Sequence, residues 1–334
     1  MPHESWVLRA RNLRVTYGSG TSRRVEAVRG LDLTLQPGTC LAVVGESGSG
    51  KSSLARALTG LTRDASGDVH LRTPDGSAFS FLDATAREQR SRRGLLQIVF
   101  QDPMNSFNPR LSIGESVAEP MRNLLSLPKA KCQERVLALL DAVGLKSATY
   151  ASYPHELSGG QRQRAGIARG LACSPRVLIL DEAVSALDTS LRAQVLNVLK
   201  KKKEEEGLAM IFITHDFSVV RSLADRVLVM YQGRAVEEGT RAQVMENPQH
   251  PYTRCLIHAL PIPDPRLERE RIRLAPPPFK RDPLATLSGC AYYDRCEEAD
   301  EACTLSVPSL PEGDHGAACH HRGEPHLPHD DLRK

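Results

Sequence analysis

One short segment restricts the fold of this chain more than any other, the sequence GESGSGKS at residues 45–52. It lies between an apolar run, Leu41 to Val44, that predicts a strand and the sequence SSLARALTGL, which predicts a helix. Glycines in such a loop let backbone N–H groups close around phosphate oxygens, and the start of the following helix adds partial positive charge. The segment therefore predicts a nucleotide phosphate loop within an α/β sheet.

Two side chains of this loop have defined chemical tasks. Lys51 is expected to reach the β- and γ-phosphates, and the Ser52 hydroxyl to coordinate Mg²⁺. A plain glycine-rich turn is the alternative, and the strand and helix patterns on either side argue against it. The candidate phosphate-binding residues are Gly45, Glu46, Ser47, Gly48, Ser49, Gly50, Lys51, Ser52 and Ser53.

A pair of acids follows a second apolar strand pattern. The run Val177 to Leu180 ends at Asp181 and Glu182. A parallel sheet presents such an acid beside the phosphate loop. We expect Asp181 to hold Mg²⁺, directly or through water, and Glu182 to polarise the attacking water. Taken alone the pair is equally consistent with a helix N-cap, and downstream of a phosphate loop it indicates catalysis.

A second glycine-rich anion cradle, Leu157-Ser-Gly-Gly-Gln161, precedes the helix pattern RQRAGIARGLA. One nucleotide does not need two such cradles on one chain. With this segment the sequence resembles the ATP-binding subunits of ABC transporters over about 250 residues. In that family the LSGGQ segment closes over the γ-phosphate bound to the opposite subunit. The resemblance therefore implies two subunits that enclose two ATP molecules.

The resemblance implies roles for further residues. Tyr17 resembles the aromatic residue that stacks on adenine, with a core tyrosine as the alternative, and Gln101 resembles the glutamine that senses Mg²⁺ and the transmembrane partner. Asp188 resembles the residue that couples the two sites across the dimer, and His215 the histidine that contacts the γ-phosphate. Ala183 departs from the family, which usually has proline there, and this affects local rigidity more than chemistry. The implied catalytic residues are Lys51, Glu182 and His215, the implied Mg²⁺ ligands are Ser52, Gln101 and Asp181, and the implied second cradle is Ser158, Gly159, Gly160 and Gln161.

Later residues indicate one branch of the family. His250-Pro-Tyr-Thr253, followed by a proline-rich tail with cysteines, resembles the oligopeptide and dipeptide importers, as do the stretches 101–109, 153–160 and 184–188. The best resemblance is to the second of their two ATPase subunits. It implies ATP hydrolysis that drives peptide import, with permease subunits, a second ATPase subunit in a heterodimer and an extracytoplasmic binding protein as partners. Nickel and glutathione importers share this architecture and are the alternative.

Charge and hydropathy exclude several other classes. The chain has 44 Lys and Arg against 40 Asp and Glu, and this net charge of +4 is too small to argue for nucleic acid. No apolar run approaches the ~18 residues of a membrane span, and the sequence MPHESWVLRARN at the N-terminus lacks the apolar core of a signal peptide. We therefore expect a peripheral protein at the cytoplasmic face of the inner membrane.

Two other functional classes were weighed against a transporter subunit. A soluble ABC ATPase of the DNA-repair or translation type is expected to carry a long coiled-coil insertion or a second ATPase domain, and this chain has neither. A regulatory module that senses ATP without hydrolysing it is expected to lack Lys51 or Glu182, and both are present.

Four of the eight cysteines are concentrated in the tail. Four thiolates can ligate an iron–sulfur cluster or a structural Zn²⁺. Some members of the importer branch hold such a cluster, and the lack of close CxxC pairs favours [4Fe–4S] over zinc. Four reduced structural thiols are one remaining alternative. A mixed site with the nearby His315, His320 and His321 is another, although these histidines are not the expected ligands. The candidate ligands are Cys290, Cys296, Cys303 and Cys319.

The chain is expected to fold in two parts. Residues 1–255 are assigned to an ATP-binding domain, an α/β P-loop core of the ABC type with a helical subdomain at about 102–175. Proline becomes dense from Leu260 onward and periodic apolar patterning fades. Residues 256–334 are therefore assigned to a small, loop-rich, cysteine-bearing C-terminal domain that begins with a linker.

Overall fold

The structure is a computed structural model that describes residues 6–18, 24–102, 106–260, 288–311 and 313–321. The proline-dense stretch 261–287 and the last residues, 322–334, which the sequence indicated as linker and tail, lie outside the described residues. Residues 103–105 of the stretch 101–109 lie outside them as well.

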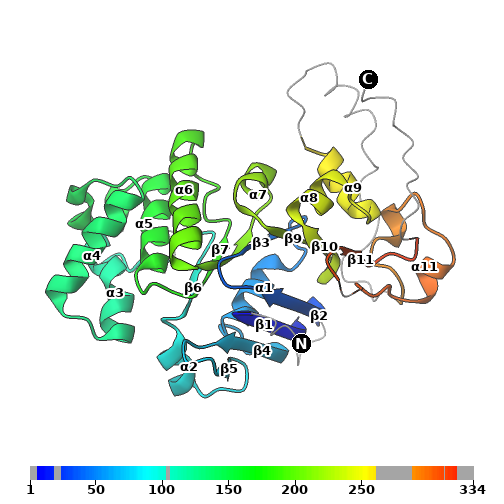
Figure 1. The fold of residues 1–334 in the computed structure, drawn as a ribbon, viewed down its shortest axis with the longest axis horizontal. Helices are drawn as coiled ribbons and strands as arrows, with labels where there is room; N and C mark the ends of the chain where they lie inside the picture. Colours follow the sequence, from blue (N-terminus) through cyan, green and yellow to red (C-terminus); the bar gives the residue numbers. More distant parts are fainter. Residues whose placement is uncertain (1–5, 19–23, 103–105, 261–287, 312, 322–334) are drawn as a thin grey trace.

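A seven-stranded sheet forms the centre of the molecule, with the strand order β11-β10-β9-β3-β8-β7-β6 (Figure 1). Strands β9, β3, β8, β7 and β6 are parallel, and β10 and β11 add an antiparallel edge. Strands β3, β7 and β8 are buried along their whole length, because helices cover both faces of the sheet. The strands are β3 (Cys40–Val44), β6 (Leu96–Val99), β7 (Val177–Asp181), β8 (Ala209–Ile213), β9 (Arg226–Tyr231), β10 (Arg234–Thr240) and β11 (Gly316–Ala317).

A second, antiparallel sheet of four strands has the order β2-β1-β4-β5. Helix α1 (Lys51–Leu58) lies between the two sheets (Figure 1), and its residues Leu54 and Leu58 are fully buried there. The apolar residues of β1 and β2 alternate with polar ones, so that one face of this sheet covers α1. The strands are β1 (Leu8–Tyr17), β2 (Val25–Leu35), β4 (Ala65–Arg72) and β5 (Ala78–Ser80).

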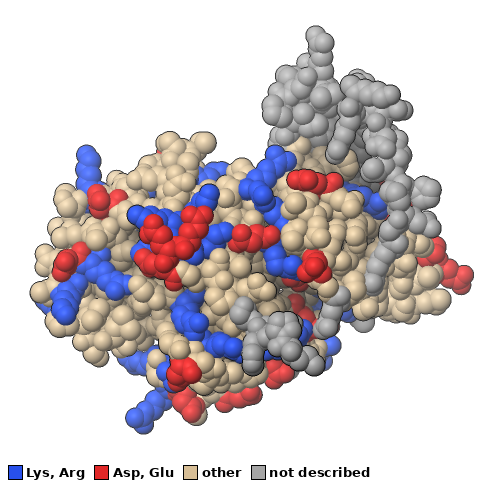
Figure 2. Space-filling view, viewed as in Figure 1, with Lys and Arg blue, Asp and Glu red and all other residues tan. Residues whose placement is uncertain are grey.

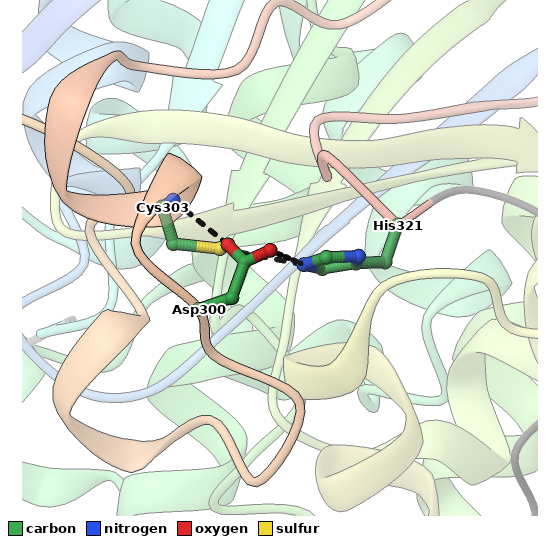
Figure 3. Close-up of side chains that lie close together, drawn as sticks. All are labelled: Asp300, Cys303 and His321. Carbon is green, nitrogen blue, oxygen red and sulfur yellow. Dashed lines mark hydrogen bonds and ion pairs between the residues drawn. The ribbon is translucent and has the colours of Figure 1, made fainter.

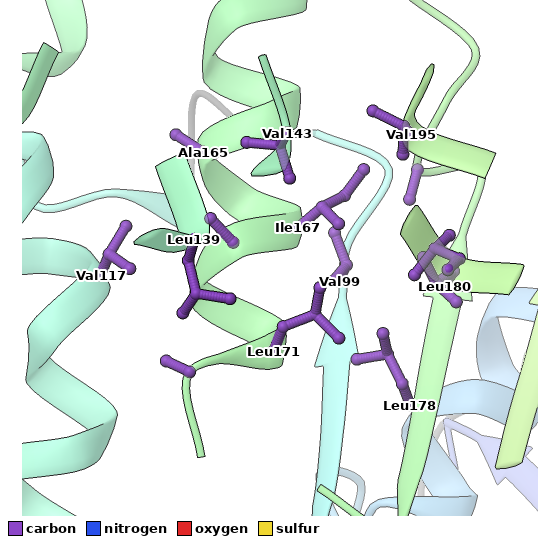
Figure 4. Close-up of a cluster of buried hydrophobic side chains, with 14 of the residues drawn as sticks. Val99, Val117, Leu139, Val143, Ala165, Ile167, Leu171, Leu178, Leu180 and Val195 are labelled. Atoms are coloured by element: carbon purple, nitrogen blue, oxygen red, sulfur yellow. The ribbon is translucent and has the colours of Figure 1, made fainter. Parts of the chain in front are cut away.

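A group of helices packs against the β6 and β7 side of the large sheet. The buried cluster in Figure 4 joins Leu139 of α4 and Ile167 of α5 to Val99 of β6 and Leu180 of β7. These contacts fix α5 relative to the strands that lead to the predicted site. The helices of this group are α3 (Ile113–Leu125), α4 (Lys129–Ala142) and α5 (Gly159–Leu171).

The remaining helices connect or flank the strands. Helices α6 and α7 lie on the face of the large sheet opposite α1, and Val195 of α6 packs on the side chains that β7 and β8 direct to that face (Figure 1). The helices that connect or flank the strands are α2 (Ala86–Arg92), α6 (Thr189–Glu206), α7 (Phe217–Leu223), α8 (Arg241–Glu246), α9 (Pro251–His258) and α11 (Ala302–Leu305).

The cysteine-bearing segment packs against the edge of the large sheet. Strand β11 pairs with β10, and Tyr292 is buried against Tyr231 of β9 and Tyr252 of α9. Residues separated by the proline-dense stretch therefore share one apolar cluster. Within the described part of the chain, no helix is both long enough and apolar enough to cross a membrane. Acidic and basic side chains lie side by side over the face shown in Figure 2.

Candidate nucleotide site and comparison with known proteins

The loop at residues 45–50 connects β3 to α1 and requires glycine at two of its positions. Gly45 has φ +149°, and a Cβ there would lie 2.2 Å from the Met230 carbonyl oxygen. Gly50 has φ +99°, and a Cβ there would lie 2.1 Å from the Ala27 carbonyl oxygen. Only glycine fits both the conformation and the space. The predicted strand, loop and helix therefore form with the geometry of an anion cradle.

The Lys51 side chain folds back over this loop. Its Nζ donates hydrogen bonds to the Gly45 carbonyl at 2.8 Å, the Glu46 carbonyl at 2.7 Å and the Ser49 hydroxyl at 3.2 Å. Burial lowers the pKa of Lys51, while the charge of Glu182 acts in the opposite direction. The ammonium group is thus held at the loop by acceptors that a phosphate can replace.

Two of the three predicted Mg²⁺ ligands, Ser52 and Asp181, lie together at the end of β7. The Ser52 hydroxyl hydrogen-bonds to Asp181, and burial raises the pKa of Asp181. Within the described part of the chain, the buried Asp181 Oδ1 has no hydrogen-bond partner. A buried, unpaired carboxylate oxygen beside a hydroxyl is an all-oxygen donor set, which is what Mg²⁺ prefers. These residues fit the predicted ion.

Glu182 is held by both its backbone and its side chain. Its φ of +48° is unusual for a residue with a Cβ, and its carbonyl accepts a hydrogen bond from Gln163 Nε2 at 3.1 Å. Gln101 Nε2 donates to its carboxylate at 2.8 Å, and His215 Nδ1 lies 3.3 Å from it. Two residues that the sequence singled out from separate segments, Gln101 and His215, therefore meet at the carboxylate of a third, Glu182.

Tyr17, the predicted adenine-stacking residue, lies at the end of β1 beside the first turn of α1. Its hydroxyl donates to the Ser53 hydroxyl at 3.2 Å, and its ring is half-buried against the apolar cluster around α1. The position next to the phosphate loop is consistent with a stacking role.

The second glycine-rich cradle begins α5, on the helical side of the molecule (Figure 1). Ser158 and Gln161 form a capping box: the Gln161 N–H donates to Ser158 Oγ at 3.2 Å, and the Ser158 N–H donates to Gln161 Oε1 at 2.8 Å. A Cβ added at Gly159 would meet no atom within 4 Å, whereas one at Gly160 would lie 3.3 Å from Leu187. The cradle is therefore open outward at Gly159.

Asp188 is the N-cap of α6. Its carboxylate accepts hydrogen bonds from the Leu191 N–H at 2.9 Å and the Ser190 hydroxyl at 2.8 Å, and these bonds lower the pKa of Asp188. The sequence singled out this residue for coupling across a dimer, and the structure gives it a local task as well.

The tail cysteines influence one another through space. Burial raises the pKa of Cys290, Cys296 and Cys303, and the neighbouring Cys319 raises each further. Figure 3 shows a closer group, in which His321 Nε2 lies 3.3 Å from Asp300 Oδ2 and 3.8 Å from Cys303 Sγ. Within the described residues, this is the one group of three metal-ligand atoms that all lie within 4.8 Å of one another. Sequence reasoning had set His321 aside and had not considered Asp300.

Sequence reasoning missed three residues at the nucleotide site. Gln163 is 1% exposed, donates to the Glu182 carbonyl and accepts from the Ala186 N–H. No sequence pattern predicts these two bonds. Tyr252 appeared only as part of a branch motif, and Arg295 did not appear at all. Both contact the phosphate loop, as described below.

Comparison with known proteins identifies the family to which the chain belongs. Residues 28–185 match the ABC transporter model, and residues 236–303 match the model of the oligopeptide/dipeptide transporter C-terminal region. The chain is 44% identical over 301 residues to the dipeptide transport ATP-binding protein DppF of Haemophilus influenzae, and the alignment covers 90% of each chain. It is 46% identical over 301 residues to the oligopeptide transport ATP-binding protein OppF of Salmonella typhimurium, covering 89% of this chain and 88% of the relative. The chain belongs to this family of transport ATP-binding proteins.

Solved structures confirm the predicted fold class. A dimeric ATP-binding cassette in a post-hydrolysis state with ADP and Pi aligns with a TM-score of 0.63 and 28% identity, covering 70% of this chain and 98% of that one. The cbiO1 protein of Clostridium perfringens, part of an ABC transporter complex, aligns with a TM-score of 0.61 and 29% identity, covering 73% and 92%. The chain is an ABC ATPase, the ATP-binding subunit of a transporter, as its sequence predicted.

Proposed function

We propose that this subunit drives the uptake of peptides through a membrane permease, by hydrolysing ATP at the site around Lys51, Asp181 and Glu182. One observation carries the proposal. Gln101 and His215 come from separate segments to the Glu182 carboxylate, whose charge acts on Lys51 of the phosphate loop, in an ABC ATPase whose relatives at 44% and 46% identity are named for dipeptide and oligopeptide transport.

Binding of ATP begins at the phosphate loop. The backbone N–H groups of residues 47–52 and the positive end of α1 receive the phosphates, and Lys51 exchanges its present carbonyl acceptors for β- and γ-phosphate oxygens. The Tyr17 ring lies beside α1, where it supports stacking on adenine.

Ser52 and Asp181 would hold Mg²⁺, and Gln101, the third predicted ligand, donates to the adjacent Glu182. When bound, the ion neutralises charge on the phosphates. The Glu182 carboxylate accepts the proton of the attacking water, and Gln101 and His215 keep this carboxylate in place. Lys51 and His215 stabilise the charge on the transferred phosphoryl group.

A second ATPase subunit completes the site. The cradle of residues 158–161 is open outward at Gly159 and belongs to α5, which packs on α3, α4 and β6, whereas α1 packs on β1, β2 and β7. An outward-facing anion cradle suits the γ-phosphate of a partner subunit, and the related cassette in complex with ADP and Pi is dimeric. Asp188 follows Leu187, whose side chain would lie 3.3 Å from a Cβ at Gly160, so it lies beside the cradle and is suited to couple the two sites.

The further partners are permease subunits and an extracytoplasmic peptide-binding protein, with the ATPase attached peripherally at the cytoplasmic face of the membrane. A heterodimer with a second ATPase is the expected assembly. Gln101 is the residue nearest to Glu182 that is suited to pass the closing and opening of the dimer on to the permease.

Uptake of labelled di- and oligopeptides tests the proposal in cells that lack this subunit. Wild type is expected to restore uptake, and Glu182→Gln to leave it at background although the variant is made in equal amount. Restored uptake with the Glu182→Gln variant contradicts the catalytic assignment. Uptake that never depends on the subunit contradicts a peptide substrate, and labelled nickel and glutathione then test the alternative cargoes.

We also propose that the tail thiols hold a [4Fe–4S] cluster. The lack of close CxxC pairs in the sequence is what favours the cluster over zinc. Among the described residues, the one group of three ligand atoms within 4.8 Å of one another joins Cys303 to Asp300 and His321. Cys290, Cys296, Cys303 and Cys319 would ligate it, and their mutual effect on pKa supports their sharing one site.

Metal analysis of anaerobically purified protein tests this second proposal. Four iron and four sulfide per chain are the expected result, with a loss of both in Cys303→Ser. Stoichiometric zinc that is lost when His321 or Asp300 is substituted contradicts the cluster and indicates a zinc site at the mixed group shown in Figure 3. Protein without metal leaves four reduced thiols and overturns the proposal.

A further inference from the structure

The second residue of the phosphate loop, Glu46, is bonded on both sides. Its carbonyl accepts a hydrogen bond from Lys51 Nζ at 2.7 Å. On the other side, its N–H donates to the Tyr252 hydroxyl at 2.8 Å, and its carboxylate pairs with Arg295. Three of the polar groups of Glu46 are thus engaged, and two of them bond to residues within 236–303, the stretch that matches the C-terminal region of oligopeptide/dipeptide transporters.

In the pair between Arg295 and Glu46, one guanidinium nitrogen donates to both carboxylate oxygens. Arg295 Nη1 lies 2.9 Å from Glu46 Oε1 and 3.1 Å from Oε2, and the bonds to Glu46 raise the pKa of Arg295. The Arg295 side chain is only 16% exposed, whereas that of Glu46 is 44% exposed. An arginine already fixed by its surroundings loses little freedom when it pairs, so it can hold a more mobile glutamate.

Arg295 and Tyr252 are themselves fixed by packing. Tyr252 is 1% exposed and packs against Tyr231 and Tyr292, with ring centroids 4.5 Å and 5.5 Å away. Arg295 lies over the Tyr292 ring, 5.7 Å from its centroid. The tyrosine cluster therefore provides a rigid support from which two polar groups reach the phosphate loop.

We propose that Tyr252 and Arg295 are positioning residues for ATP: they hold Glu46 so that the loop and Lys51 are set for the phosphates before the nucleotide arrives. The proposal rests on the proposed nucleotide site. A loop fixed in its binding conformation loses less freedom on binding, so its affinity is higher. Through Arg295, the cysteine-bearing segment thereby acts on the first step of the ATPase cycle.

The experiment compares two arginine variants of the full-length subunit. Arg295→Met removes the pair with Glu46, and Arg254→Met is the matched control. Arg254 forms an ion pair with Glu298 in the same part of the molecule, is 14% exposed, and makes no bond to the loop. Affinity for a fluorescent ATP analogue with Mg²⁺, the KM and kcat for ATP, and the melting temperature without nucleotide are measured for each.

We expect Arg295→Met to weaken nucleotide binding and raise the KM about two- to fivefold, the range for a lost ion pair with one partly exposed partner, with kcat within about twofold. Tyr252→Phe keeps the ring, and it is expected to act in the same direction. Arg295→Lys is expected to recover part of the affinity, and the double variant Glu46→Gln, Arg295→Met to lose no more than the larger single loss. Arg254→Met is expected to lower the melting temperature like Arg295→Met and leave the KM unchanged.

Two results overturn the proposal. Unchanged affinity in both Arg295→Met and Tyr252→Phe shows that the loop is set without them. Equal losses of affinity in Arg254→Met and Arg295→Met show that both variants act through general destabilisation. Lys51→Ala separates this proposal from the site assignment, because normal ATP binding in Lys51→Ala refutes the phosphate site itself.

Discussion

At Glu182, separate contacts fix the backbone and the carboxylate. Gln163 holds the carbonyl, while Gln101 and His215 face the side chain. The left-handed backbone at +48° is the kind of local strain that surrounding contacts maintain at functional sites. Because the backbone contact does not depend on charge, the side chain can be neutralised without releasing the residue from its position.

Glu182→Gln is therefore expected to preserve ATP binding and to lower turnover by a factor of about 10² to 10⁴, the range for losing a general base. ATP is expected to trap the subunit as a dimer, because the γ-phosphate persists between the two cradles. Steady-state ATPase rates and light scattering with and without ATP measure both effects. Glu204→Gln, an exposed position on α6, is the control and should match wild type. Wild-type turnover in Glu182→Gln removes this residue from catalysis.

Lys51 gives a second test at the scale of one side chain. Its ammonium group is buried and bonded to loop acceptors that phosphates replace. Lys51→Ala removes charge-assisted bonds worth about 1.5–3 kcal/mol each, so ATP affinity is expected to fall at least tenfold. Titration calorimetry with ATP and Mg²⁺ measures this loss, with the exposed Lys200→Ala as the control. Equal affinities in the two variants contradict the phosphate-loop assignment.

Among the secondary-structure elements, α9 has the least common N-cap. His250 Nδ1 accepts a hydrogen bond from the Tyr252 N–H at 3.0 Å, while the His250 N–H donates to Glu237 at 2.9 Å. Only a neutral imidazole can accept that bond. Burial, reinforced by the charge of Arg254, lowers the pKa of His250 to about 3.

This cap predicts acid sensitivity. Above pH 6.5 the imidazole is neutral in both states, and as the pH falls from 6.5 toward 3 only the unfolded chain gains the proton. The free energy of unfolding is therefore expected to decrease by up to about 1.4 kcal/mol per pH unit in that window. His250→Asn keeps a capping oxygen and should reduce this slope, measured by urea unfolding between pH 7 and pH 4. The exposed His155→Asn should not change it. The same slope in all three proteins contradicts a buried neutral His250.

The sequence predicted the local parts of the site and missed those that depend on distant contacts. Residues 45–52 and 177–182 could be assigned because the strand, the loop and the next element are adjacent in the chain, so the motif itself carries the geometry. Arg295 pairs with Glu46 across 249 positions, and Gln163 reaches Glu182 from another helix. No periodicity or spacing encodes such a contact, because it depends on how the elements pack.

At the scale of the whole molecule, the cysteine-bearing segment is integrated into the nucleotide-binding unit. It adds β11 to the large sheet, places Tyr292 in the tyrosine cluster and brings Arg295 to the phosphate loop. The loss of apolar periodicity after residue 260 suggested a separate tail, but β11 and the buried Tyr292 join the segment to the large sheet and its apolar cluster. Stability and nucleotide binding are therefore linked through the same cluster.

Tyr292→Ala tests this integration. The side chain is 1% exposed, contacts Tyr231, Tyr252 and His250, and its hydroxyl donates to Cys255 Sγ at 3.3 Å. Removing a buried aromatic ring leaves a cavity and is expected to lower the free energy of unfolding by about 3–5 kcal/mol, measured by urea unfolding of the whole subunit. The adjacent Tyr293→Ala, only half-buried, should cost far less. The contrary result is that both variants unfold like wild type while proteolysis releases the residues after 260. The segment would then be held independently of the sheet, and its packing could not act on the phosphate loop.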